Sequence, residues 1–301
     1  MTNFFSKLPG YDVTATHFRS PTFNDELIEW RKADLRDPQQ VEEVITNFDV
    51  VIQAAATTSG IKDAISRPDY HVTDNAVMNS LIFRRASQAK VKHLIFFSCT
   101  TMLQSSESPQ TENDFDANDE VYGRYFGVGW TKVYLEKMCE FFSQNSETKF
   151  TVIRHSNVYG PWDKYDLENS HVFGATITKV LLATETIEIW GDGSEKRDLL
   201  YIADLVDFVK RALDNQKYRF RIYNCGGNVL VSTRALTERI MLIAEKKLRV
   251  FFNVDKPTVK FSVFLDNGLA MDELGWVPRV ELDTGIRLSI DFWNEHIKKV
   301  E

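Results

Sequence analysis

The chain has 301 residues, of which 43% are hydrophobic, enough to bury a full core in one large or two modest domains. Its net charge is −7, with no basic run, no segment long enough to span a membrane and no signal-peptide core, so nucleic acid and membrane are not expected partners. Three cysteines lie far apart without metal-ligand spacing, which indicates free thiols in a reducing cytoplasm and no metal site.

The first third of the chain alternates between helix and strand patterns. Small residues end the strand over 48–56, at Ala54, Ala55 and Ala56, and let a ligand approach closely. The apolar strand over 91–98 is typical of the centre of a parallel sheet. The predicted elements are a helix tail over 3–10, a strand over 11–17, a helix after 33–37, a buried strand over 48–56, a helix over 75–89 and a strand over 91–98.

Residues 121–142 predict an amphipathic helix that carries a lysine about one turn inside. Lys132 shares a face of this helix with the apolar Val128 and Leu135. A lysine on such a face either extends its stem along the rim of the core, with its ammonium in water, or has a function. The helix alone leaves both interpretations open.

The second half predicts further elements of the same kind. A strand over 150–155 runs into Asn157, at the end where parallel sheets bind ligands. Gly226 and Gly227 predict a plain turn rather than a phosphate-binding loop. The remaining predicted elements are a helix over 203–213, a strand over 221–225 and helices over 233–247 and 284–296.

Several ordered motifs are similar to those of the extended short-chain dehydrogenase/reductase family, and within it to the branch of GDP-L-fucose synthase and the nucleotide-sugar epimerases. Gly129-Trp130-Thr131-Lys132 resembles the second half of the Tyr-x-x-x-Lys signature. The substrate half is matched by Asn157-Val158-Tyr159-Gly160-Pro161, Ile189-Trp190-Gly191-Asp192-Gly193 and Arg197-Asp198. The resemblance covers the chain from Tyr11 onward.

This resemblance implies an α/β fold with a doubly wound, Rossmann-like parallel sheet and a smaller C-terminal substrate domain. Residues 1–160 would form the NAD(P)-binding domain, with segments near 195–225 returning to it, and 161–301 would be mainly the substrate-binding domain. The first strand and its Gly-x-x-Gly-x-x-Gly turn, which cradles the cofactor pyrophosphate, are expected before Met1. They would either be encoded upstream of an internal methionine or be absent from the protein.

The implied cofactor is NADP or NAD. Arg19 lies where such folds contact the adenosine ribose, and a basic group there accepts the 2′-phosphate of NADP. A solvated loop arginine is the equal alternative. The residues that the resemblance assigns to the cofactor are Arg19, Asp34, Leu35, Ala54, Ala55, Ala56, Lys132 and His155.

The resemblance also assigns catalytic and substrate-binding residues. Thr100 would bind the reacting oxygen, Lys132 the nicotinamide ribose, and His171 would transfer protons in epimerisation. A capping or loop histidine is the alternative for His171. The residues assigned to the nucleotide-diphospho-sugar are Asn157, Lys179, Trp190 and Arg197, with Lys179 in place of an arginine.

Two positions depart from the family pattern. Val128 stands where the family has its catalytic tyrosine, and Met102 stands where the synthase has a cysteine. Neither side chain carries a proton. Tyr125 lies roughly 10 Å before Lys132 along the helix and leans away from it, so we do not expect it to replace the tyrosine.

The predicted function is hydride and proton transfer on a nucleotide-diphospho-sugar by an NAD(P)-dependent epimerase, dehydratase or reductase. The alternative is a non-catalytic nucleotide-sugar-binding or partner subunit of the same fold, to which Val128, Met102 and the missing phosphate loop point. The family expectation is a homodimer through the helices that contain residues 75–89 and 132–142.

Overall fold

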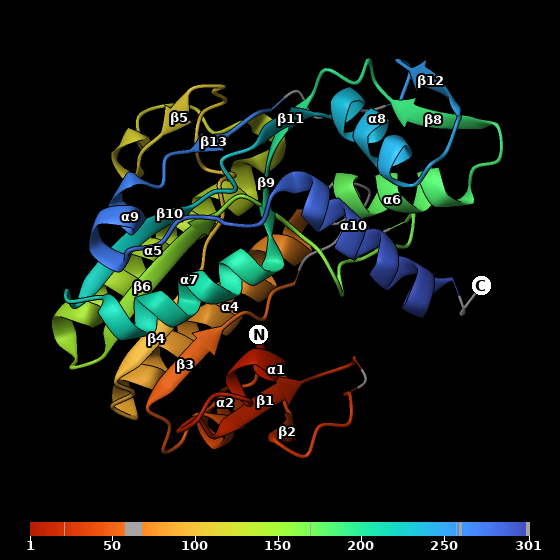
Figure 1. Ribbon diagram of the computed structural model, residues 1–301. Coiled ribbons are helices and arrows are strands. Elements are labelled where there is room, and N and C mark those ends of the chain that lie inside the picture. The colour runs from red at the N-terminus through yellow and green to blue at the C-terminus, as the bar shows by residue number, and fades with distance from the viewer. Residues whose placement is uncertain (21, 58–67, 169, 257, 259–260, 299–301) are drawn as a thin grey trace.

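Four parallel strands form the central sheet in the order β10-β6-β4-β3. The computed structural model describes residues 1–20, 22–57, 68–168, 170–256, 258 and 261–298. The strands are β3 (Val50–Gln53), β4 (His93–Phe97), β6 (Lys149–His155) and β10 (Phe220–Cys225). Because every neighbouring pair is parallel, their carboxyl ends meet along one edge (Figure 1).

Helices cover both faces of this sheet, since successive side chains of a strand point to opposite faces. Leu94 and Phe96 of β4 pack in one cluster with residues of α4 and α5, and Ile95 packs on the other face with residues of α7 and α9. This confirms the doubly wound α/β fold. The helices are α4 (Pro68–Gln88), α5 (Phe126–Asn145), α7 (Ile202–Asn215) and α9 (Gly268–Leu274).

The N-terminal segment forms a second sheet, in which β1 (Val13–His17) pairs in parallel with β2 (Ile28–Lys32). The short helix α1 (Thr2–Phe5) inserts Phe5 into the cluster that also contains Ile95. Asp37 caps α2 (Pro38–Val44) by accepting hydrogen bonds from two backbone N–H groups. In the described residues, no strand pairing joins β1 to β3.

One strand prediction needs correction. The strand predicted as buried over 48–56 is shorter, ends at Gln53 and is mostly half-buried. It lies at the edge of the described sheet, where one side of the strand has no neighbour to cover it. The three alanines that follow are exposed.

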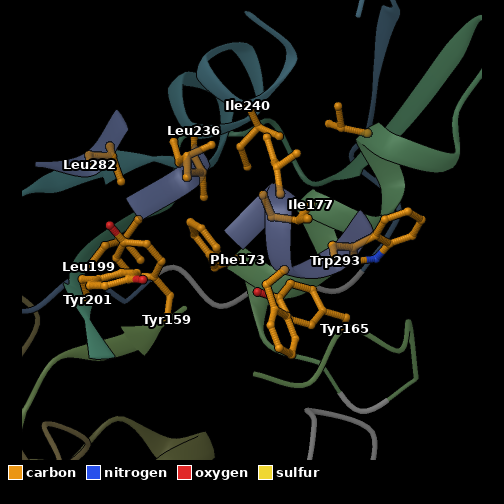
Figure 2. Packing of buried hydrophobic residues seen from close by; sticks show 14 of the residues in the cluster. Tyr159, Tyr165, Phe173, Ile177, Leu199, Tyr201, Leu236, Ile240, Leu282 and Trp293 are labelled. Atoms are coloured by element: carbon orange, nitrogen blue, oxygen red, sulfur yellow. The ribbon is translucent and has the colours of Figure 1, made fainter. Parts of the chain in front are cut away.

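The C-terminal part surrounds a hydrophobic cluster of its own (Figure 2). Tyr159, Phe173, Ile177 and Trp293 are all nearly or fully buried there, and the rings of Tyr159 and Phe173 lie 4.2 Å apart. Around it lie α6 (Val172–Leu182), α8 (Thr233–Ile243), α10 (Leu282–Phe292) with its π-helical continuation (Trp293–Ile297), and the parallel pair β8 (Thr186–Trp190) and β12 (Arg249–Asn253).

Short strands connect the two parts. β9 (Lys196–Tyr201) pairs in parallel with β7 (Asn157–Tyr159) and antiparallel with β11 (Leu230–Ser232). β5 (Pro109–Gln110) pairs with β13 (Phe264–Leu265), and single 3₁₀ turns cover Glu112–Asp114 and Gly123–Tyr125.

The two adjacent glycines form an irregular connection after β10. The Gly226 N–H donates to Asn267 Oδ1 at 2.7 Å and the Gly227 N–H to Asp198 Oδ1 at 2.8 Å. Both donors are therefore occupied by side chains and do not face a phosphate.

Candidate active site

Lys132 lies on α5, with its ammonium at the carboxyl end of the central strand β4. Its Nζ donates a hydrogen bond to the Phe97 carbonyl at 2.8 Å and lies 4.8 Å from the ring centroid of Phe96. The ammonium thus points inward rather than into solvent. Burial lowers the pKa of Lys132, and the neighbouring Cys99 and Glu136 oppose this effect.

The segment after β4 supplies hydroxyl and thiol groups. Thr100 is half-buried, and its carbonyl accepts the Leu103 N–H. Cys99 Sγ lies 3.0 Å from Thr101 Oγ1. Cys99 is also an electrostatic neighbour of Lys132, so a thiol shares this strand end with the lysine.

His155 closes β6, the next strand of the sheet. Its Nδ1 lies 2.8 Å from the Ser156 carbonyl, and its ring is 6.0 Å from that of Phe97. Burial, together with the Lys132 ammonium, lowers the pKa of His155 to about 4, although the hydrogen bond with Ser156 opposes this effect. His155 is therefore neutral at physiological pH and shares its surroundings with Lys132.

Val128 lies one helical turn before Lys132 and is half-buried. Tyr125, at the N-cap of α5, packs its ring against Tyr122 and Phe261, with centroids 5.6 and 5.2 Å away. Burial raises the pKa of the Tyr125 phenol, and its strongest charged neighbour is Arg197. The Tyr125 phenol therefore lies near Arg197, one of the predicted substrate residues.

A buried ion pair supports the helix that carries Lys132. Arg154 Nη2 lies 2.7 Å from Glu136 Oε2, and both side chains are only 4% exposed. Ser98 Oγ donates to the same carboxylate at 2.6 Å. The pair joins α5 to β4 and β6 and fixes the helix against the strand end where the Lys132 ammonium lies.

The residues assigned to the adenosine side of a dinucleotide lie together. Arg36 makes three hydrogen bonds to Asp34, two of them from its side chain, and holds the pKa of that carboxyl at about 2, with a smaller effect from Arg19. The Arg19 guanidinium lies 5.1 Å from the Phe18 ring centroid, and Leu35 packs against the core cluster of α2, α4 and α5. An open hollow of about 600 Å³ is lined by Asp34, Arg36, Asp37, Pro38 and Gln39.

These groups fit the two ends of a nicotinamide dinucleotide. The hollow beside Asp34 and the exposed Ala54–Ala56 backbone offer room on the adenosine side, and Lys132 offers a cation at the other end. For the pyrophosphate, the adjacent pair Gly226 and Gly227 already donates both N–H groups within the protein.

The predicted substrate residues lie on β7, α6, β8 and β9. Asn157 donates to the Asp198 carbonyl at 3.1 Å. Arg197 is half-buried and donates from Nη1 to the carbonyls of Lys196 and Phe261, at 2.7 and 2.9 Å. Burial lowers the pKa of Arg197, and Tyr125 and Glu195 oppose this effect.

Lys179 and Trp190 form a second cationic group. The Lys179 ammonium lies 5.4 Å from the indole centroid of Trp190 and donates to the Glu188 carbonyl at 3.1 Å. Lys256 lies 5.7 Å from the same indole. Burial lowers the pKa of Lys179, and Glu188 opposes this effect. Two ammonium groups thus lie near one half-buried indole.

His171 is the N-cap residue of α6 and is exposed. Its charged neighbours are Asp163 and Lys164, not Lys132. The structure therefore brings Lys132, Thr100 and His155 to the ends of the neighbouring strands β4 and β6. Arg19 follows β1, and Asp34 and Leu35 follow the paired strand β2. The structure places His171 near Asp163 and Lys164 instead.

The sequence motifs gave no role in the site to Cys99, Glu136 and Asp163. Glu136 follows Lys132 by four residues, a helical spacing that could have indicated a shared face. Cys99 immediately precedes Thr100. The proximity of Asp163 to His171 depends on a loop that packs against α6.

No helix in the described ranges combines the length and apolar character needed to cross a membrane. Within the same ranges, no group of three or more His, Cys, Asp or Glu side chains could hold a metal ion.

Comparison with known proteins places this geometry in context. The pattern of the NAD dependent epimerase/dehydratase family matches residues 5–226. GDP-L-colitose synthase of Yersinia pseudotuberculosis is 28% identical over 81% of this chain and 80% of its own length. GDP-L-fucose synthase of Azorhizobium caulinodans is 26% identical over 86% of this chain and 85% of its own.

Solved structures share the fold. UDP-glucose 4-epimerase of Thermotoga maritima superimposes with a TM-score of 0.82 at 22% identity, over 97% of this chain and 93% of its own. A dTDP-glucose 4,6-dehydratase of Streptomyces venezuelae, solved with NAD, superimposes with a TM-score of 0.82 at 18% identity, over 99% of this chain and 92% of its own.

Proposed function

Because the chain belongs to the NAD dependent epimerase/dehydratase family, we propose that it catalyses epimerisation or reduction of a GDP-linked sugar. The choice of guanine rests on the relatives, which are named for GDP-L-colitose and GDP-L-fucose. The observation that carries the proposal is the inward-pointing Lys132 ammonium at the end of β4, beside Cys99 and His155. Parallel sheets bind ligands at this edge.

The cations on the C-terminal side support a diphosphate-bearing ligand. Lys179 and Lys256 flank the Trp190 indole, and Arg197 lies half-buried on β9. A ligand phosphate near Lys179 would favour the charged ammonium, which burial disfavours. The indole would stack on a flat or apolar part of the ligand.

The bound nicotinamide would give or accept the hydride at the sugar carbon. Lys132 would hold its ribose and Thr100 the sugar oxygen, while Asp34, Leu35 and Ala54–Ala56 would contact the adenosine side. Arg19 lies close enough to Asp34 to lower the pKa of its carboxyl, and its guanidinium would favour NADP over NAD.

A homodimer is part of the proposal. Large apolar side chains are exposed on the outer helices, among them Val77 on α4 (41%) and Phe126, Tyr134 and Phe141 on α5 (57–62%). On α5 these three recur at helical intervals along one stripe. An exposed stripe of this kind fits a second copy of the chain.

The test is binding and turnover measured separately. GDP-mannose and UDP-glucose are titrated by calorimetry into the protein and into a Lys179→Ala variant, and NADPH oxidation is followed with a GDP-4-keto sugar. We expect the GDP-sugar to bind, the variant to lose at least about tenfold in affinity, and NADPH to be consumed. Binding with neither NADPH consumption nor an epimerised product would instead indicate the non-catalytic subunit.

A further inference from the structure

We propose that Asp163 is a positioning residue that orients His171 by accepting a hydrogen bond from its imidazole, so that the other ring nitrogen can act as a base on the sugar. Resting on the proposed function, this inference adds a residue to which no sequence motif gave a role.

The first observation is a fixed carboxylate with an unsatisfied oxygen. Asp163 follows Gly160-Pro161-Trp162, and its N–H donates to the Gly160 carbonyl at 3.2 Å. Its Oδ1 accepts the Lys164 N–H at 2.7 Å. Its Oδ2 is buried and has no hydrogen-bond partner among the described residues. A buried carboxylate oxygen normally has a donor, so this atom is ready to accept one.

The second observation is the close approach of α6 to this carboxylate. A Cβ on Gly174, in the first turn of α6, would lie 2.3 Å from the Lys164 carbonyl oxygen and 3.6 Å from Asp163 Oδ2. His171 opens the same turn, because its carbonyl accepts the Ala175 N–H at 3.0 Å. Glycine at this position allows the helix start, and His171 with it, to lie against Asp163.

The third observation is electrostatic coupling between the two side chains. Burial lowers the pKa of the His171 imidazole, the Asp163 carboxylate raises it, and Lys164 lowers it. Reciprocally, burial raises the pKa of Asp163, and the Lys164 N–H and His171 oppose this effect. Because His171 is exposed, water reaches its ring and moderates the effect of burial.

A hydrogen bond to Oδ2 would have a chemical consequence. The ring nitrogen that faces the carboxylate would carry the proton, and the other would present its lone pair. That nitrogen can take the proton from a sugar carbon next to a carbonyl. The C–H bond breaks, its electron pair moves onto the carbonyl oxygen as an enolate, and the imidazolium can return the proton to carbon.

The first experiment needs no substrate. His171 is titrated by NMR in the wild type, in Asp163→Asn and in the control Glu168→Gln, which removes an exposed charge from the same loop; His171→Ala assigns the signal. We expect Asp163→Asn to lower the His171 pKa by about half a unit to one unit and to change the ¹⁵N tautomer signature. An unchanged titration and tautomer would overturn the proposal.

A second variant separates orientation from charge. Gly174→Ala keeps both side chains but forces the first turn of α6 away from the Lys164 carbonyl. We expect the His171 titration to shift in the same direction as in Asp163→Asn, while circular dichroism reports a folded protein. A folded Gly174→Ala protein with wild-type titration would contradict the role of this close approach.

Activity then distinguishes this proposal from the proposed function. With a GDP-4-keto sugar, exchange of the sugar C–H proton with solvent is expected to slow at least about tenfold in Asp163→Asn, with KM little changed. Wild-type exchange in Asp163→Asn would overturn the positioning role. A shifted titration with neither exchange nor NADPH oxidation in the wild type or any variant would support the Asp163–His171 pair and refute the proposed function.

Discussion

The ion pair between Arg154 and Glu136 offers a quantitative test of how the active-site helix is held. Both side chains are 4% exposed, and they are joined by two hydrogen bonds of 2.7 and 3.1 Å. Replacing Glu136 by Gln keeps an oxygen acceptor but leaves the buried guanidinium without an opposite charge. We expect this change, or Arg154→Met, to lower the free energy of unfolding by about 3–5 kcal/mol.

The double variant Glu136→Met/Arg154→Met removes both charges together. It leaves the Ser98 hydroxyl without its acceptor, which costs about 1–2 kcal/mol, and the Glu112 carbonyl without its Arg154 donor. The double variant is therefore expected to be more stable than either single variant, and the coupling energy of the cycle should reach at least about 2 kcal/mol.

Urea unfolding followed by circular dichroism, at fixed protein concentration, measures all of these free energies. The matched control is Glu140→Gln, which breaks the more exposed Lys137–Glu140 pair of 2.9 Å on the same helix and should cost less than about 1 kcal/mol. If Glu136→Gln costs no more than this control, or if the single effects simply add, the ion pair does not hold α5 in place.

Four further outcomes follow from the site and its surroundings. Val128→Tyr places a phenol one turn before Lys132 and should raise any reductase rate at least roughly 10²-fold, whereas an unchanged rate would show that another residue already supplies the proton. Lys132→Met should lower the turnover number at least about tenfold and leave GDP-sugar affinity within about twofold in calorimetry, because its ammonium lies at the strand end and not beside Trp190. Burial raises the pKa of Asp198 from 3.8 to about 7, so protonated Asp198 contributes on the order of 4 kcal/mol to the free energy of unfolding below about pH 4, and this contribution is lost as the pH approaches 7. In Asp198→Asn, the free energy of unfolding should not fall in this way between about pH 4 and 7. Equal pH dependence in the wild type and the variant would contradict the raised pKa of Asp198. Phe141→Asp should convert the expected dimer into a folded monomer in sedimentation analysis, and a dimer of unchanged affinity would place the interface elsewhere.

The elements that the sequence predicted well are those whose pattern is local. β4 is continuous and apolar because it lies between β3 and β6, and the spacing of Val128 and Leu135 marked the helix that became α5. β2 was missed because only two of its five residues are apolar and its fit depends on pairing with β1. α6 was missed because it starts at His171 without a capping side chain and contains Gly174 and several β-branched residues.

The residues of the site likewise fall into those that a local sequence pattern marked and those that only the folded structure brings together. Lys132 was marked by one apolar helix face and by a short motif, and the structure shows its ammonium turned inward. The Arg154–Glu136 pair could not be seen, since its members are eighteen residues apart and meet only when α5 packs on β6. Asp163 gains its importance from a contact with the start of α6, a distance that no spacing rule encodes.

The measurement that tests the central assignment most directly is NADPH oxidation by the purified full chain, with a GDP-4-keto sugar as substrate and the product analysed by mass spectrometry. The account predicts either a reduced GDP-sugar with matching consumption of NADPH or an epimerised GDP-sugar with NADPH intact, and loss of this activity in Lys132→Met. A GDP-sugar that binds but is returned unchanged, with NADPH intact, would contradict catalysis by this chain.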